Sequence, residues 1–307
     1  MTDAERPLRF RGPEGLALTG FVRPAREGAR PPALVFTPGN GFAVQAYRPF
    51  LAHLPGDVTV HALNHRGHGG SDAPERLESW DGLLADLRAY VERELEPPVI
   101  LAGHSMGAML ALRLAAEAPA LAAGLLLLEP PLRLAPGQAL TPGEAEGRRV
   151  FIDRARNRRA DWPSRAEAEA WFAGSVVYRL WTPEARRGFL EAGLAERPDG
   201  SVTLATPPWL EAALYETVPQ QELYAWAARA PCAAVLYRGL DSPVPSLPAY
   251  EALANALPVC ALVPVPGTHA FPMEHPDEAG RRLAEGLRLL RGETGLALTG
   301  AAAAGTR

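Results

Sequence analysis

A strand, a tight turn and a helix follow one another over residues 98–117, and this succession constrains the fold more than any other feature. The apolar run 98–102 predicts a buried strand, and 108–117 consists of good helix formers. Between them lies Gly-His-Ser-Met-Gly, residues 103–107. Glycines two residues before and two after Ser105 allow a turn too tight for bulky side chains. We expect a strained serine with its hydroxyl outside the sheet edge, at a helix N-terminus; the alternative is an ordinary turn with a capping serine.

Strands and helices alternate over most of the chain. The sequence predicts strands at 16–22, 33–36, 58–63, 98–102, 124–128, 233–237 and 259–265, and helices at 80–94, 108–117, 247–257 and 277–291. Alternation of this kind implies right-handed βαβ crossovers. We therefore predict an α/β fold with a mostly parallel central sheet flanked by helices.

The alternation stops between residues 135 and 226. Short helical patches at 164–173 and 183–195 are separated there by proline and glycine. We interpret 135–226 as a helical cap inserted into one sheet domain, whose two parts are 1–134 and 227–291. The tail 292–307 is rich in glycine, alanine and threonine, and we expect it to be disordered.

Composition excludes some classes of function. The chain of 307 residues has a formal net charge of −4, which gives no electrostatic reason to expect nucleic acid binding. Its two cysteines, Cys232 and Cys260, lie in apolar runs and are expected as buried thiols in a reducing compartment. With no signal-peptide pattern and no apolar run of about 18 residues, we expect a soluble cytoplasmic protein without a membrane span. The oligomeric state stays open.

A serine hydroxyl becomes a nucleophile when a base removes its proton, and the base is oriented by an acid. Asp241 and His269 each follow a predicted strand, and the carboxyl ends of parallel strands meet at one edge of a sheet. Asp241 could alternatively cap the turn before Pro243, and His269 could be an ordinary loop histidine. Glu129, which ends the strand after the Ser105 helix, is the rival for the acid.

The reaction places negative charge on an oxygen, which requires preorganised N–H donors. The backbone N–H of Met106, directly after the serine, is one candidate. The other is the backbone of Asn40 in the loop Thr-Pro-Gly-Asn-Gly-Phe, residues 37–42, where glycines permit close approach to a ligand. That loop could also be a plain glycine-rich turn.

Together these motifs resemble the α/β-hydrolase-fold serine hydrolases that carry a helical cap. Residues 37–42 stand where that family usually has His-Gly-x, with Pro38 in place of the histidine. Residues 64–72, Asn-His-Arg-Gly-His-Gly-Gly-Ser-Asp, resemble the family's Arg-Gly-x-Gly-x-Ser loop, and the turns 239–241 and 267–269 match as well.

The resemblance covers about residues 8–135 and 227–291. The family order of serine, acid and histidine favours Asp241 over Glu129 as the acid. A serine nucleophile also argues against haloalkane dehalogenases and epoxide hydrolases, which use aspartate at that position.

Aromatic and arginine residues gather in the predicted cap. We expect an apolar substrate pocket lined by Phe42, Trp162, Trp171, Tyr178 and Trp181, although such side chains could equally pack the cap onto the core. Seven arginines between Arg148 and Arg165 could form an anion site, but a solvated helix face is the favoured interpretation.

The sequence therefore predicts a serine hydrolase that cleaves a carboxylic ester, thioester or amide of a small, largely apolar molecule through an acyl-enzyme. We expect no cofactor and no metal, since His65 and His68 lack nearby cysteines or carboxylates that would complete a ligand set. The alternatives are C–C bond hydrolysis or cofactor-free perhydrolysis by the same triad, or a catalytically silent ligand-binding protein.

Overall fold

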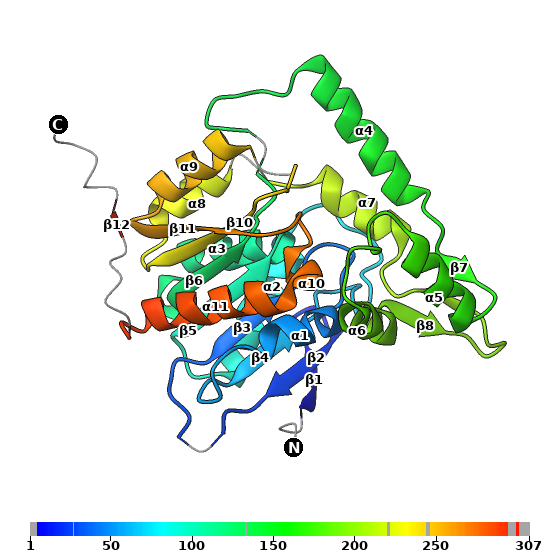
Figure 1. The fold of residues 1–307 in the computed structure, drawn as a ribbon, viewed down its shortest axis with the longest axis horizontal. Coiled ribbons are helices and arrows are strands. Elements are labelled where there is room, and N and C mark those ends of the chain that lie inside the picture. Colours follow the sequence, from blue (N-terminus) through cyan, green and yellow to red (C-terminus); the bar gives the residue numbers. More distant parts are fainter. Residues whose placement is uncertain are drawn as a thin grey trace.

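A nine-stranded sheet forms the centre of the molecule, in the order β1-β2-β4-β3-β5-β6-β10-β11-β12 (Figure 1). The computed structural model describes residues 5–26, 28–132, 134–219, 222–243 and 246–293, with the backbone of 299–300. The strands are β1 (Arg6–Arg11), β2 (Ala17–Arg23), β3 (Leu34–Thr37), β4 (Val60–Leu63), β5 (Val99–His104), β6 (Ala122–Leu128), β10 (Ala234–Gly239), β11 (Val259–Val265) and β12 (Thr299–Gly300).

The middle of this sheet is parallel. Strands β4, β3, β5, β6, β10 and β11 pair in parallel, whereas β1, β2 and β12 join antiparallel at the two edges. The predicted α/β fold with a mostly parallel sheet is confirmed. Every residue of β3 and β5 is buried, as expected for parallel strands that are covered on both faces.

Helices cover the two faces of the sheet and divide its core in two. One core contains residues of α2 (Asp81–Glu94), α3 (Met106–Glu117), α8 (Glu222–Arg229) and α9 (Leu247–Ala256). The other contains residues of the 3₁₀ helix η1 (Val44–Tyr47), α1 (Arg48–Leu51), α10 (Phe271–Glu274) and α11 (Pro276–Leu290). Alternation along β3 shows the division, since Val35 lies in the first core and Leu34 and Phe36 lie in the second.

The chain between β6 and β10 leaves the sheet and forms a separate layer of helices. It contains α4 (Pro142–Arg156), α5 (Arg165–Gly174), α6 (Pro183–Gly193) and α7 (Pro208–Glu216), then α8, which packs on α3 and α9 of the core. A small antiparallel sheet, β7-β9-β8, joins β7 (Asp161–Trp162), β9 (Val202–Leu204) and β8 (Leu194–Glu196). Figure 1 shows α4 standing out from the sheet, with α7 beneath it.

Two features were not predicted from the sequence. The sequence analysis did not predict strand β1 or the three strands of the small sheet. The strands of the small sheet are only two or three residues long, too short for a period to show. The tail also differs in part from expectation, because Thr299–Gly300 pairs with β11 at Val259 and Cys260. The rest of the predicted disorder falls on 294–298 and 301–307, outside the described residues.

Two further predictions from composition concern the cysteines and membrane-spanning helices. Neither cysteine forms a disulfide among the described residues, and Cys260 is buried and Cys232 partly buried. Over the described residues, no helix has both the length and the apolar character needed to cross a bilayer.

Candidate active site

Ser105 occupies the strained turn between β5 and α3. Its φ of 55° and ψ of −116° are rare for a residue with a side chain, and its hydroxyl does not cap α3. A Cβ on Gly103 would lie 2.3 Å from the carbonyl carbon of Gly107, and a Cβ on Gly107 would lie 2.3 Å from the carbonyl oxygen of Thr37. The two glycines are therefore required by close backbone approach. The interpretation of Ser105 as an ordinary helix cap does not fit this geometry.

His269 lines the same cavity as Ser105 and is held by Glu129. Its Nδ1 is 2.6 Å from Oε2 of Glu129, so Nδ1–H donates to that carboxylate and Nε2 carries the lone pair of the ring. Glu129 is completely buried and also accepts the backbone N–H of Gly239 at 2.6 Å and the hydroxyl of Ser242 at 2.8 Å. Its φ of 44° is the second strained backbone at this edge of the sheet.

The expectation that Asp241 pairs with His269 is wrong. Asp241 is exposed, and its backbone N–H donates to the carbonyl of Gly267 at 3.0 Å, which fixes the turn with the side chain outside. Strand β6 lies between β5, which carries the serine, and β10. Asp241 follows β10, the strand next to the one that precedes His269, so strand order alone does not favour Glu129. The 2.6 Å contact of the buried Glu129 carboxylate with Nδ1 of His269 and the exposure of Asp241 decide the pairing.

A second carboxylate fixes the backbone around the histidine. Glu274 of α10 accepts the N–H of Thr268 at 2.8 Å and the Thr268 hydroxyl at 2.5 Å. The N–H of Ala270 in turn donates to that hydroxyl at 3.2 Å. His269 is thus held by its side chain through Glu129 and by its flanking residues through Glu274.

The loop of residues 37–42 lies directly against the serine. A Cβ on Gly39 would be 3.2 Å from Cβ of Ser105. The N–H of Gly39 donates to the hydroxyl of Tyr47 at 3.2 Å, and that of Gly41 donates to Nε2 of His68 at 3.0 Å. Among the described residues, no acceptor binds the N–H of Asn40 between them, nor that of Met106 at the start of α3.

His65 and His68 support this loop. The Nε2–H of His65 donates to the carbonyl of Pro38 at 3.1 Å, and the Nδ1–H of His68 donates to the carbonyl of Arg66 at 3.0 Å. Burial lowers the pKa of His65 to about 3 and that of His68 to about 4, so both are neutral at pH 7. Within the described ranges, no group of three or more candidate metal ligands exists.

A cavity of about 390 Å³ opens over Ser105 and His269. Its wall is mostly apolar and comes from the core loops, α4 and α7: Asn40, Phe42, Trp80, Met106, Pro131, Leu140, Glu144, Gly147, Arg148, Phe151, Ile152, Leu214, Tyr215 and Val218. Pockets of this size suit small-molecule ligands. No hydrogen bond joins the Ser105 hydroxyl to His269 among the described contacts, a common state before substrate binds.

Of the predicted pocket residues, only Phe42 lines this cavity. The expectation was wrong for Trp162, Trp171, Tyr178 and Trp181, which pack among themselves and around Phe172 and Phe189. Ring centroids are 4.8 Å apart for Tyr178 and Trp181 and 4.7 Å apart for Phe172 and Tyr178. These aromatic side chains are continuous with the core on the face of the sheet that α1 and α11 cover, so they pack the inserted layer onto the core, which was the alternative interpretation.

Three further aromatic residues line the cavity and were not among the predicted pocket residues: Trp80, Phe151 and Tyr215. Trp80 directly precedes α2, and its indole N–H donates to the carbonyl of Leu214 at 3.3 Å. No sequence signal distinguished it from the five tryptophans of the cap.

The arginine-rich stretch 148–165 is largely paired within the protein. Arg148 donates to the carbonyls of Tyr215 and Glu216 at the end of α7, and Arg158 forms a 2.7 Å ion pair with Glu211. Others pair with carboxylates on the surface: Arg149 with Glu146 and Asp153, and Arg156 with Glu216. These contacts favour a structural role over an anion site.

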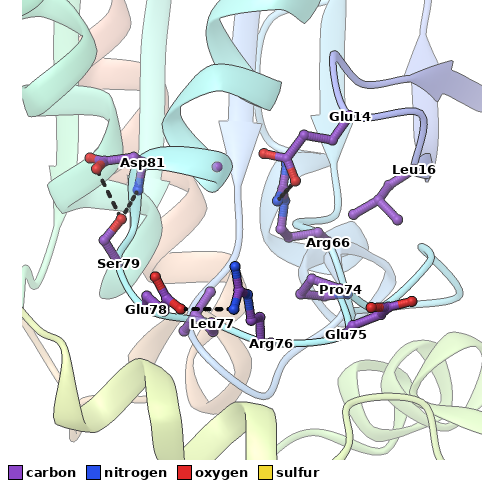
Figure 2. Close-up of a pocket in the computed structure, with 11 residues that line it drawn as sticks. Glu14, Leu16, Arg66, Pro74, Glu75, Arg76, Leu77, Glu78, Ser79 and Asp81 are labelled. Atoms are coloured by element: carbon purple, nitrogen blue, oxygen red, sulfur yellow. Dashed lines mark hydrogen bonds and ion pairs between the residues drawn. The ribbon is translucent and has the colours of Figure 1, made fainter.

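A separate cavity of about 530 Å³ is lined by residues 74–79 of the loop that leads into α2 and by Glu14, Leu16 and Arg66 (Figure 2). Glu14 forms an ion pair with Arg66 there at 2.9 Å, and Glu78 with Arg76 at 3.4 Å. Arg66 is also bound to Asp86 through two hydrogen bonds. Neither Ser105 nor His269 contributes to its wall, and we assign no site to it.

The mostly parallel sheet, with Ser105 on the strained turn after β5 and His269 bound to the buried Glu129, is typical of hydrolases with an α/β fold. Comparison with known proteins gives the same answer, since the model of the alpha/beta hydrolase family matches residues 34–281. The chain belongs to that family.

Individual relatives match in part. The human monoglyceride lipase is 33% identical over 128 residues, which is 39% of this chain and 42% of the lipase. Thioesterase TesA of Mycobacterium marinum is 34% identical over 86 residues, or 27% of this chain and 34% of the thioesterase. The chain thus matches less than half the length of these curated relatives. The crystal structure of E-2-(acetamidomethylene)succinate hydrolase superposes with a TM-score of 0.76 at 20% identity, over 92% of this chain and 99% of that one.

Proposed function

We propose that this protein is a serine hydrolase that cleaves an ester or thioester through an acyl-enzyme at Ser105. The observation that carries the proposal is the 2.6 Å hydrogen bond from His269 to the fully buried Glu129, beside a serine in strained conformation in the same cavity. Relatives named as a lipase and a thioesterase support ester or thioester chemistry. An amide remains a third substrate type for the same groups.

The residues take the following roles in the proposed reaction. The hydroxyl of Ser105 attacks the carbonyl carbon while Nε2 of His269 takes its proton and later passes it to the leaving group. Glu129 holds the tautomer of His269 and stabilises the imidazolium. The N–H groups of Asn40 and Met106 bind the developing oxyanion. Water then repeats the sequence and releases the acid.

The cavity supports a neutral, largely apolar acyl group. Its wall is formed mainly by Phe42, Leu214, Tyr215, Phe151 and similar residues. Among the described lining residues, Arg148 is an arginine that donates to two carbonyls at the end of α7. We propose that this arginine holds the end of α7 and does not bind the acyl group. We also propose that residues 135–226 act as the cap that encloses this group.

A fluorophosphonate probe tests the nucleophile. The wild type should be labelled covalently and should hydrolyse p-nitrophenyl butyrate, and Ser105→Ala should do neither. Ser164→Ala is the matched control, because Ser164 only caps α5 and should label like the wild type. Labelling of Ser105→Ala equal to the wild type would refute the assignment, and an unlabelled, inactive wild type would favour a silent binding protein.

A further inference from the structure

A chain of buried hydrogen bonds connects the loop before the serine to the backbone of His269. The N–H of Gly39 donates to the Tyr47 hydroxyl at 3.2 Å, and that hydroxyl donates to Nδ1 of His104 at 2.7 Å. On the other side of the ring, the Nε2–H of His104 donates to the carbonyl of His269 at 2.7 Å. Tyr47 and His104 are both fully buried.

The direction of each bond follows from which groups can donate. The carbonyl of His269 can only accept, so the proton of the His104 ring lies on Nε2 and Nδ1 accepts. The Tyr47 hydroxyl then has one proton for His104 and a lone pair for the Gly39 N–H. Burial keeps both side chains neutral, because it raises the pKa of Tyr47 and lowers that of His104. The directions are therefore fixed at ordinary pH.

Each end of this chain lies next to a group of the proposed reaction. Gly39 precedes Asn40, whose N–H is a proposed oxyanion donor. His104 precedes Ser105 and binds the carbonyl of His269, the proposed base. Ring centroids of His104 and His269 are 4.7 Å apart. A shift of either residue would thus move the donor, the nucleophile or the base.

We propose that Tyr47 and His104 are positioning residues that hold the oxyanion loop, Ser105 and His269 in register with one another. Neither residue lines the substrate cavity, so both act through their neighbours. This inference rests on the proposed function. Misplacement of reacting groups by about 1 Å costs on the order of 100-fold in rate, which sets the scale of the expected effect.

Tyr47→Phe removes only the hydroxyl that connects the N–H of Gly39 to the ring of His104. We expect kcat for p-nitrophenyl butyrate to fall about 10- to 100-fold with KM within about twofold of the wild type. The rate of fluorophosphonate labelling should fall in parallel. A merely structural loss would instead lower the amount of folded enzyme and leave kcat per labelled site unchanged.

Tyr90→Phe is the matched control. Tyr90 is a buried tyrosine whose hydroxyl lies 2.8 Å from Nδ1 of His61, and neither residue lines the site cavity. This variant should lose comparable stability and keep kcat near the wild-type value. Equal losses of kcat in Tyr47→Phe and Tyr90→Phe would overturn the proposal.

His104→Asn provides a second route should Tyr47→Phe fail to fold. The shorter amide keeps a polar group near the position of Nδ1 and removes the donor to the His269 carbonyl, so a similar loss of kcat is expected. Wild-type kcat in either folded variant overturns the positioning role while the proposed function stands. A wild type that is neither labelled nor active overturns both proposals.

Discussion

Glu129 combines complete burial, a φ of 44° and hydrogen bonds to His269, Gly239 and Ser242. An amide can keep the bond to Gly239 through its oxygen, but its NH2 group in place of Oε2 would face the Nδ1–H of His269. Glu129→Gln keeps the shape but removes the charge that fixes the His269 tautomer, so kcat should fall on the order of 10⁴-fold. Steady-state hydrolysis of p-nitrophenyl butyrate measures this.

Asp241→Asn serves as the comparison at the same sheet edge. Its side chain is exposed, and the turn is held by the backbone N–H of Asp241 on Gly267. We expect kcat within about threefold of the wild type, as is usual for a surface substitution. A larger loss for Asp241→Asn than for Glu129→Gln would contradict the geometry described above.

At this scale the sequence identifies groups with a local signature and misses those defined by distance. Ser105 lies in a turn flanked by two glycines. His269 lies in the turn after a strand, two residues after a glycine. Glu129 and Asp241 both follow strands that end at one edge, and chain order alone favoured the wrong one. The placement of the side chains distinguishes them, since Glu129 is buried against His269 and Asp241 is exposed.

The contact of helix α6 with η1 depends on a glycine. A Cβ on Gly188, in the middle of α6, would lie 2.1 Å from the carbonyl oxygen of Gln45, which is buried backbone. We expect Gly188→Ala to lower the free energy of unfolding by about 1–3 kcal/mol, as overpacking commonly does. Guanidinium denaturation at pH 7.5 measures the change.

Gly147→Ala is the control for a helix-interior glycine. In the middle of α4 an added Cβ meets nothing within 4 Å, and the backbone conformation is ordinary. The same chemical change should therefore stabilise the protein, by about 0.5–1 kcal/mol. Stabilisation of both variants would show that α6 does not approach η1 as closely as described.

Elements with long periodic runs were predicted to within one or two residues, as for α11 and β11. Those of the inserted layer were not, because β7, β8 and β9 are too short for a period to show. Its aromatic residues were recognised as a group. Which of them line the cavity depends on how α4 and α7 pack over Ser105 and His269, and no local sequence pattern predicts that packing.

The apolar cavity of about 390 Å³ predicts how the whole molecule selects substrates. Each added methylene should raise kcat/KM about fourfold, from roughly 0.8 kcal/mol of burial, until the cavity is full. A series of p-nitrophenyl esters of rising acyl length should therefore climb and then fall. An ester that ends in a carboxylate should gain nothing over its neutral counterpart.

Leu214→Ala enlarges the cavity and should move the optimum to longer chains, since Leu214 lines the wall and is buried. A flat series in the wild type would contradict an enclosed apolar pocket. A preference for anionic esters that Arg148→Ala abolishes would make that arginine a binding group.

Buried neutral histidines make the stability of the whole molecule depend on pH. The native pKa values of His65 and His68 are about 3 and about 4, below the unfolded value of about 6.5. Below pH 6.5 the unfolded chain takes up protons that the native protein does not. Below pH 6.5, the free energy of unfolding should then fall by about 1.4 kcal/mol for each pH unit and for each of these histidines. Above pH 6.5, the two histidines should add no pH dependence.

Denaturation at pH 7.5, 6.0 and 5.0 measures this slope before most carboxylates titrate. His65→Gln keeps a donor for Pro38 and should reduce the slope by one histidine's share. An unchanged slope in that variant would show that His65 is protonated in the native protein.

The proposed machinery is divided unequally by the inserted layer. Asn40, Ser105, Met106 and Glu129 precede it along the chain, and His269 alone follows it. Strands β6 and β10 nevertheless pair directly over Ala234–Tyr237. A peptide bond cut inside the layer would thus yield a large amino-terminal fragment complete except for its base, and a partner fragment that supplies the base through the sheet. Such a pair is the natural starting point for a split enzyme that regains turnover only on reassembly.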